Sequence, residues 1–178
     1  MSKLWICALL GLSLFIASCS DQKQSPKKNG LSARAVVEPA KGSNISGIVT
    51  FTEVDNGVLV VADIKGLKPG KHGFHVHEHG DCSSPDFTSA GGHFNPTNKK
   101  HGGPDSAERH VGDLGNIEAK QDGTAHYERV DQVIELSGPN SIVGKSILIH
   151  ADEDDLVSQP TGNAGARIGC GIIELIYK

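Results

Sequence analysis

Residues 45–65 read ISGIVTFTEVDNGVLVVADIK, and this stretch decides the fold class. Val, Ile and Thr dominate both of its halves, as is typical of strands. Between the halves lies Asp55-Asn56-Gly57, and the Asn-Gly pair accepts the positive φ angles that a tight hairpin turn requires. The stretch therefore predicts a β-hairpin with strands over residues 45–53 and 58–65.

Runs of similar composition recur along the chain, separated by turn signals such as Lys68-Pro69-Gly70 and Asp122-Gly123. Eight short strands joined by hairpins and by longer crossings predict an all-β, eight-stranded Greek-key β-sandwich or barrel of the immunoglobulin-like kind. No regular helix is expected, and at most one short helical turn, over residues 152–156. The further strands are expected over residues 33–38, 73–79, 113–119, 124–130, 147–150 and 168–177.

Two segments interrupt this pattern, residues 80–109 and residues 151–166. Both are rich in small, polar and charged residues, and neither has a hydrophobic period. A loop of this length in a compact domain stays ordered when something other than a hydrophobic core holds it. We expect both segments to be ordered loops that something other than a hydrophobic core holds in place.

The start of the chain does not belong to this fold. Residues 4–17 are almost entirely apolar, a length that suits the core of a signal peptide and is short for a membrane span. The run ends in Ile16-Ala17-Ser18-Cys19, which resembles the bacterial lipoprotein processing box, where the peptide is cut before the cysteine and lipid is attached to its thiol. We expect a signal peptide over residues 1–18, followed over residues 19–32 by a lipidated Cys19 and a polar, flexible tether.

The residue after Cys19 is Ser20 rather than an aspartate, which in lipoproteins points to the outer membrane. The expected location is therefore the periplasm or cell envelope, with the domain of residues 33–178 anchored to the outer membrane by lipid. The alternative is plain secretion, with Cys19 incidental.

The net charge limits the partners of the exported chain. The whole sequence has 17 Lys and Arg residues against 21 Asp and Glu residues. Loss of residues 1–18 removes only Lys3, which leaves 16 against 21, a net charge of −5. An acidic body argues against nucleic acid and against an anionic membrane surface as partners, so that a membrane is reached only through the lipid. A homodimer is a candidate assembly that the sequence does not decide.

Six of the nine histidines, together with one aspartate, predict a metal centre. His75 and His77 stand two residues apart, so a strand would direct both imidazoles to one face. His150 lies at the end of another predicted strand and would complete an all-imidazole site, which suits copper(II). The alternatives are a histidine-rich surface patch and a loose metal scavenger.

A second set of ligands lies in and just after the first long loop. Three imidazoles and one carboxylate make a good tetrahedral zinc site, and a bound metal would keep so polar a loop ordered. Its members are His93, His101, His110 and Asp113.

Several segments of the chain resemble the signatures of copper/zinc superoxide dismutases. They occur in the order found in that family, and the resemblance covers about residues 33–177. It implies a sandwich fold with long metal-binding and active-site loops. It also implies one copper and one zinc ion per subunit, and a bacterial exported type of enzyme. The segments are Gly73-Phe-His-Val-His-Glu, Ser89-Ala-Gly-Gly-His-Phe-Asn-Pro, Lys100-His-Gly-Gly-Pro, Arg109-His-Val-Gly-Asp-Leu-Gly-Asn and Gly162-Asn-Ala-Gly-Ala-Arg.

The resemblance also implies a role for single residues. His93 would bridge the two metals, and Asp154 would hold the rings of His75 and His101 by hydrogen bonds. The implied copper ligands are His75, His77, His93 and His150, and the implied zinc ligands are His93, His101, His110 and Asp113.

Cys82 and Cys170 remain as an even pair once Cys7 has left with the signal peptide and Cys19 carries lipid. In an exported domain such a pair predicts a disulfide, and the resemblance implies the same bridge. The alternative is two buried free thiols.

The implied reaction converts superoxide to dioxygen and hydrogen peroxide, with copper cycling between Cu(II) and Cu(I) and zinc structural, as an antioxidant defence. Two residues are implied to be catalytic. His93 would pass a proton to the outgoing peroxide, and the guanidinium of Arg167 would attract the anion. Thr161 matches the opposite wall of the family's channel. The alternatives are a metal-binding or chaperone domain without turnover, and a tethered metal buffer.

Two features depart from the family pattern. The loop of residues 151–166 is shorter than in animal enzymes and lacks their Glu/Lys cluster, so that Lys99, Lys100 or Lys145 would supply the guiding charges. His79 follows His77 with strand spacing, yet the family places no ligand there. We expect His79 to be exposed, and the alternative is transient capture of copper.

Overall fold

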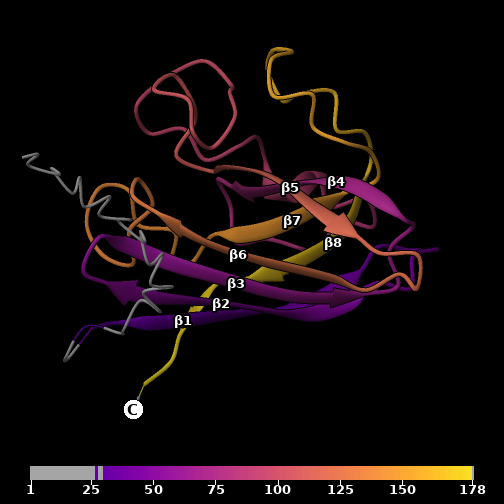
Figure 1. Cartoon of the computed structure of the whole chain (residues 1–178), viewed down its shortest axis with the longest axis horizontal. Helices are drawn as coiled ribbons and strands as arrows, with labels where there is room; N and C mark the ends of the chain where they lie inside the picture. The colour runs from indigo at the N-terminus through magenta and orange to yellow at the C-terminus, as the bar shows by residue number, and fades with distance from the viewer. Residues whose placement is uncertain (1–26, 28–29, 178) are drawn as a thin grey trace, which may run out of the picture.

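The computed structural model describes residue 27 and residues 30–177. This part of the chain forms strands joined by turns and by longer loops (Figure 1). The signal peptide, Cys19 and most of the tether lie outside the described residues. The strands are β1 (Ser32–Pro39), β2 (Ser46–Val54), β3 (Gly57–Lys65), β4 (Gly70–His77), β5 (Asp113–Ala119), β6 (Ala125–Asp131), β7 (Ser146–His150), β8 (Arg167–Ile172) and β9 (Glu174–Leu175).

Eight of these strands close into an antiparallel barrel, which confirms the predicted all-β fold. Around the ring the order is β1, β2, β3, β6, β5, β4, β7 and β8, and β8 pairs again with β1. The short β9 pairs with β1 next to β8. In the ring β3 lies beside β6 and β4 beside β7, so the chain crosses between hairpins in the Greek-key manner. Figure 1 shows β1, β2 and β3 on one side of the barrel and β4, β5 and β7 on the other.

The ends of the strands follow their local chemistry. The first hairpin closes with Val54 opposite Gly57, whose φ of +141° lies in the region that glycine favours. The last strand was expected to run unbroken over residues 168–177, and this is wrong. It is interrupted at the buried Ile173, whose main-chain N–H donates to the carbonyl of Lys145 and whose carbonyl accepts from Gly144.

The only helical element among the described residues is η1, a single 3₁₀ turn over Thr88–Ala90. The helical turn expected over residues 152–156 is wrong. The carboxamide of Asn116 donates to the carbonyl of Asp154 at 2.9 Å and accepts from its N–H at 2.8 Å. These are the main-chain groups that a helical turn would use. In the described part of the chain, no helix is long and apolar enough to cross a membrane.

β4 separates the hydrophobic core from the predicted metal centre. Phe74 and Val76 point into the barrel and pack in its core. His75 and His77 alternate with them and point to the other face of the strand, where they are also fully buried. They are covered by the loops on that side, residues 78–112 and residues 151–166, which rise from the side of the barrel that holds β4, β5 and β7 (Figure 1).

Candidate metal centre

Two clusters of metal-ligand side chains lie next to each other under the loops. In each cluster, one candidate ligand atom per residue lies within 4.8 Å of the others, and His93 belongs to both. The seven residues that the sequence singled out are therefore brought together, and all are buried. The first cluster is His75, His77, His93 and His150, and the second is His93, His101, His110 and Asp113.

The first cluster has the electronic arrangement of a cation site. Nδ1 of His77 donates to the carbonyl of Gly91 at 3.0 Å, and Nδ1 of His150 donates to that of Gly165 at 3.1 Å. Each neutral ring has only one N–H, so both Nε2 atoms carry lone pairs. These two Nε2 atoms face each other at 3.4 Å. A cation bound by both nitrogens would turn this repulsion into attraction.

Two further ring nitrogens in the same place lack partners. Nδ1 of His75 and Nε2 of His93 are buried and make no hydrogen bond. An unsatisfied buried polar atom costs about 1–3 kcal/mol, so its presence in a well-packed site calls for a ligand. Four nitrogen donors with their outer atoms held by protein groups fit copper.

The second cluster surrounds one carboxylate oxygen. Oδ1 of Asp113 lies 2.7 Å from Nδ1 of His93, 3.1 Å from Nδ1 of His101 and 3.2 Å from Nδ1 of His110. Ligand atoms around a tetrahedral zinc, with bonds of about 2.0–2.1 Å, lie about 3.3 Å apart. The other oxygen, Oδ2, accepts main-chain N–H groups from Gly102 and His110, which fix the carboxylate. The residues present therefore fit zinc.

Asp154 connects the two clusters from behind. Its Oδ2 is 2.8 Å from Nε2 of His75, and its Oδ1 is 2.9 Å from Nε2 of His101. Each ring thereby turns its Nδ1 atom toward its own cluster. The expected orienting contacts of Asp154 are thus present in the structure.

Burial controls protonation in the first cluster. Desolvation lowers the pKa of His75 to about 3 and that of His150 to about 4, with a smaller contribution from nearby His93. Desolvation also lowers the pKa of His77 and of His93. A neutral imidazole keeps the lone pair that a metal needs, so this cluster is ready to bind without first losing protons.

Hydrogen bonds control protonation in the second cluster. Burial would lower the pKa of His101, but hydrogen bonds to Asp113 and Asp154 outweigh it and raise that pKa to about 9. Burial would raise the pKa of both aspartates, but hydrogen bonds from histidines outweigh it and lower both values. Both carboxylates are therefore ionised, as ligands and partners of cations must be.

Arg167 reaches the edge of the first cluster from the start of β8. Its guanidinium donates to the carbonyls of Phe87 and Gly91. The carbonyl of Gly91 also accepts from His77, so one main-chain oxygen orients both a candidate ligand and the expected anion-binding residue. Thr161, expected on the other wall of the channel, is half-buried.

The disulfide between Cys82 and Cys170 is present, with the Cα atoms 5.9 Å apart. Cys170 packs with Phe87, Ala90 and other apolar residues in a small cluster of its own. The bridge closes a loop of 88 residues, which in the chain-entropy model contributes about 4–5 kcal/mol. It holds the segment with the carbonyls that accept from Arg167 close to the strand that carries this arginine.

A family model described as copper/zinc superoxide dismutase matches residues 45–173 of this chain. The chain belongs to the copper/zinc superoxide dismutase family. It is 51% identical over 146 residues to a copper-zinc superoxide dismutase of Onchocerca volvulus, covering 76% of this chain and 92% of that protein. It is 49% identical over 152 residues to an extracellular copper-zinc superoxide dismutase of Brugia pahangi, covering 80% and 75%. A solved structure of the clock protein EA4 has a TM-score of 0.76 and 42% identity, over 84% of this chain and 97% of that one.

Membership of the copper/zinc superoxide dismutase family makes the chain an oxidoreductase, and it gives one copper and one zinc as the family's cofactors. The relatives named above are eukaryotic, so they give no support to the bacterial lipoprotein type that the resemblance implied.

Sequence reasoning missed two buried contacts that support the dismutase site. Arg109 donates to both carboxylate oxygens of Asp131, at 2.7 and 2.8 Å, in a buried ion pair. It also donates to the carbonyl of Asp113 at 2.9 Å. His72 lies between the carbonyls of His150 and Lys68, at 2.8 and 2.9 Å from its two ring nitrogens. Arg109 belongs to one of the segments that resemble the family, so its importance could have been inferred. The partners of His72 are main-chain carbonyls, which no local sequence pattern predicts.

The remaining charged candidates lie outside both clusters. Lys99 donates to the carbonyl of Ala107, and Nζ of Lys145 lies 4.0 Å from the centre of the Phe94 ring, so both are held in place, whereas Lys100 is exposed. His79 is exposed as expected. β4 ends at His77, so the strand spacing that would have placed His79 beside the ligands is not realised.

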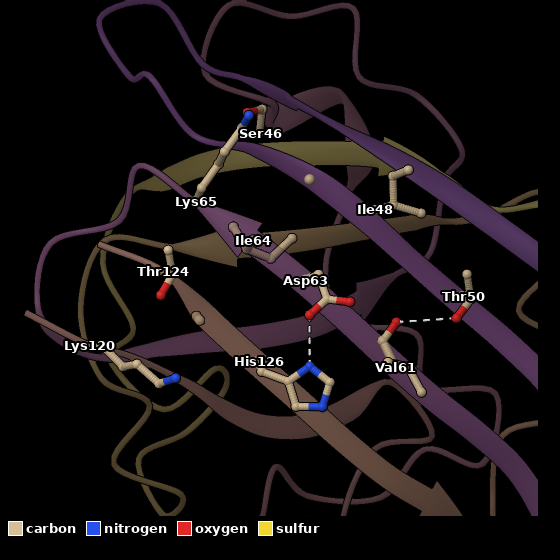
Figure 2. A pocket seen from close by; sticks show the side chains of 12 residues that line it. Ser46, Ile48, Thr50, Val61, Asp63, Ile64, Lys65, Lys120, Thr124 and His126 are labelled. Atoms are coloured by element: carbon tan, nitrogen blue, oxygen red, sulfur yellow. Dashed lines mark hydrogen bonds and ion pairs between the residues drawn. The ribbon is translucent and has the colours of Figure 1, made fainter. Parts of the chain in front are cut away.

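A surface pocket of about 650 Å³ lies away from the metal centre. It lies over β2, β3 and β6, and its lining includes Ile48, Ile64 and His126 (Figure 2). Within this pocket, Nδ1 of His126 lies 2.7 Å from Oδ1 of Asp63. The two metal clusters lie elsewhere, under the loops of residues 78–112 and 151–166, and all their candidate ligands are buried.

Proposed function

We propose that this chain is a working superoxide dismutase that converts superoxide to dioxygen and hydrogen peroxide. The observation that carries this proposal is the convergence of buried, hydrogen-bond-free ring nitrogens on one point beside a guanidinium. Copper is assigned to His75, His77, His93 and His150, and zinc to His93, His101, His110 and Asp113.

The residues of the chain have distinct tasks in this reaction. Bound copper would supply the one-electron redox chemistry, and zinc would stay at one oxidation state. His93 faces both clusters, with Nδ1 at Asp113 and Nε2 turned to the first cluster. Its Nε2 atom can hold a proton and pass it to peroxide as a general acid. Arg167 presents guanidinium N–H donors to a small anion at the rim.

The proposal is tested by loading the mature chain with one copper and one zinc and following superoxide decay after pulse radiolysis. We expect catalysed decay that scales with protein concentration. Uncatalysed decay with both metals bound would instead favour a metal-binding or chaperone domain. Binding of several further metal ions without turnover would favour a metal buffer.

The Arg167→Ala variant is expected to react with superoxide about tenfold more slowly and with a weaker dependence on salt. The exported body is acidic, so a local positive charge has to attract the anion, and such attraction is screened by salt. The measurement is the second-order rate constant at several ionic strengths. Arg34→Ala, which removes the same charge from an exposed position on β1, is the matched control. Equal rates and equal salt dependence in both variants would argue against a guiding role for Arg167.

We further propose that the chain is exported and carries lipid on Cys19, so that it acts at the periplasmic side of an outer membrane. The support is the apolar run of residues 4–17 followed by small residues and Cys19. The name of the Brugia pahangi relative supports export alone. Mass spectrometry of the native N-terminus should find lipid on Cys19. A soluble form that begins elsewhere would show plain secretion.

We also propose that two copies form a homodimer through the outer face of β1, β2 and β8. Val36, Ile48 and Ile172 are 53%, 49% and 41% exposed, and Val36 pairs directly with Ile48. Apolar side chains that are exposed together on one face commonly mark an interface. Sedimentation should give twice the mass of the mature chain, and Val36→Glu should give the single mass. A monomer before substitution would refute this assembly.

A further inference from the structure

His101 is held by the loop that covers it as well as by its own cluster. Its main-chain N–H donates to Oε1 of Gln159 at 2.9 Å, and its main-chain carbonyl accepts from Nε2 of Gln159, also at 2.9 Å. On the side-chain end, Nε2 of His101 lies 2.9 Å from Asp154. Three of the polar contacts of this buried residue are therefore made by the loop of residues 151–166, which is more than 50 residues away in the sequence.

Both N–H groups and the oxygen of the Gln159 carboxamide make hydrogen bonds. Its second N–H donates to the carbonyl of Val157 at 3.1 Å, within the same loop. The turn that carries it is closed by main-chain hydrogen bonds from Asp155 to Gly162 at 2.9 Å and from Gly162 to Ser158 at 2.7 Å. Because these bonds make the turn one unit, release of Gln159 would release the turn as a whole.

Few other contacts hold this turn down. Every residue from 155 to 161 is exposed or half-buried, and Leu156, which is 37% exposed and lies against Gly103, makes its main apolar contact. The N–H of Leu156 also donates to Asp154 at 2.7 Å. Segments with few buried contacts open at low free-energy cost, and specific polar contacts then decide how often they open. The turn ends at the buried Gly162. Its backbone lies close to Oδ1 of Asp154 and Nε2 of His101, the two atoms that contact each other there. Opening of the turn would therefore expose His101 at the second cluster.

We propose that Gln159 is a positioning residue that latches residues 155–162 onto the main chain of His101 and thereby slows the release of zinc. The inference rests on the assignment of zinc to the second cluster under the proposed function. Gln159 touches neither metal ligand atoms nor substrate, and it acts through the backbone of His101. Among the described residues, the hydrogen bonds of Gln159 reach only His101 and Val157, so its loss is expected to affect zinc release far more than copper release.

The test uses the full mature chain loaded with copper and zinc. Zinc release to a coloured chelator, copper release to a copper chelator, and the unfolding midpoint of the metal-free chain are measured for Gln159→Ala and Gln159→Glu. Gln159→Glu keeps an acceptor for the N–H of His101 but sets a carboxylate oxygen against its carbonyl. Both variants should release zinc about 10- to 30-fold faster, which is the effect expected from losing the net stabilisation of two neutral hydrogen bonds. Copper release should change much less, and the midpoint should fall by no more than about 10 °C.

Gln121→Ala and Gln121→Glu are the matched controls, because Gln121 is exposed in the turn between β5 and β6. They should leave zinc release unchanged. Zinc released by both Gln159 variants at the unmodified rate would overturn the latch. Equal acceleration of copper and zinc release with a lowered midpoint would overturn it as well, since that is general destabilisation. A chain that binds no zinc before any substitution would overturn the site assignment instead.

Discussion

The His93→Ala variant is expected to lose dismutation and to bind both metals at least about 100-fold more weakly. His93 is the only residue shared by the two clusters, and its two ring nitrogens face in opposite directions. Loss of a hydrogen-bond partner of a ligand already weakens metal binding about 10- to 100-fold, and here the ligand itself is removed from both sites. Competition titrations with copper and zinc chelators measure the two affinities, and pulse radiolysis measures the rate.

His79→Ala is the matched control for this variant. His79 lies two residues beyond His77, yet it is exposed and belongs to neither cluster. We expect unchanged affinities and an unchanged rate. Native affinities in His93→Ala would contradict a bridging ligand. Slower copper uptake in His79→Ala would bring back transient copper capture as the role of this exposed histidine.

The Gly162→Ala variant is expected to lose zinc affinity about 10- to 100-fold and to unfold at a lower temperature. A Cβ atom at Gly162 would lie 1.8 Å from Oδ1 of Asp154 and 2.7 Å from Nε2 of His101. The backbone there has a φ of +69°, which L side chains rarely adopt. The loop would have to lift away, and the contact that orients His101 would break, with the loss of affinity typical for such partners.

Gly42→Ala separates the two causes. Gly42 has a similar φ of +85°, but a Cβ atom there would meet nothing within 4 Å. We expect this control to lose only the cost of the left-handed backbone, about 1–2 kcal/mol of unfolding free energy, with zinc affinity unchanged. Equal zinc affinities in both variants would show that close approach at Gly162 does not matter for the site. The measurements are zinc competition titration and calorimetric unfolding.

The strands were predictable because their signals are local. The hairpin of residues 45–65 states its own turn and register, and alternation along β1 places Ala33, Ala35 and Val37 in the core. The strand carrying His75 and His77 was expected over residues 73–79 but runs over Gly70–His77. Its end was placed two residues too late, because that end depends on pairing with the following loop rather than on composition. There Glu78 and His79 donate their N–H groups to main-chain carbonyls of residues 90–92.

The ligand set was predictable because motifs and spacing name side chains. The contacts that hold those ligands were predictable only in part. Asp154 came from the resemblance, whereas Gln159 gave no signal, because its partners are the main-chain groups of His101. The same is true of the carbonyl of Gly91. Every residue has a main-chain carbonyl oxygen, so the sequence does not show which of them accepts a hydrogen bond from a ligand. That can be seen only once the positions of distant loops are known.

Under the proposed lipid anchor on Cys19, the closed barrel has a mechanical consequence. β1 follows directly on the segment that would carry the anchor, and it pairs with β2 on one side and with β8 and β9 on the other. Antiparallel hydrogen bonds stand perpendicular to the strands, so a pull along β1 loads two rows of them in shear at once. In the ring, β5 is the strand farthest from β1. Traction on the anchor would thus be borne across the barrel from the strand that supplies Asp113.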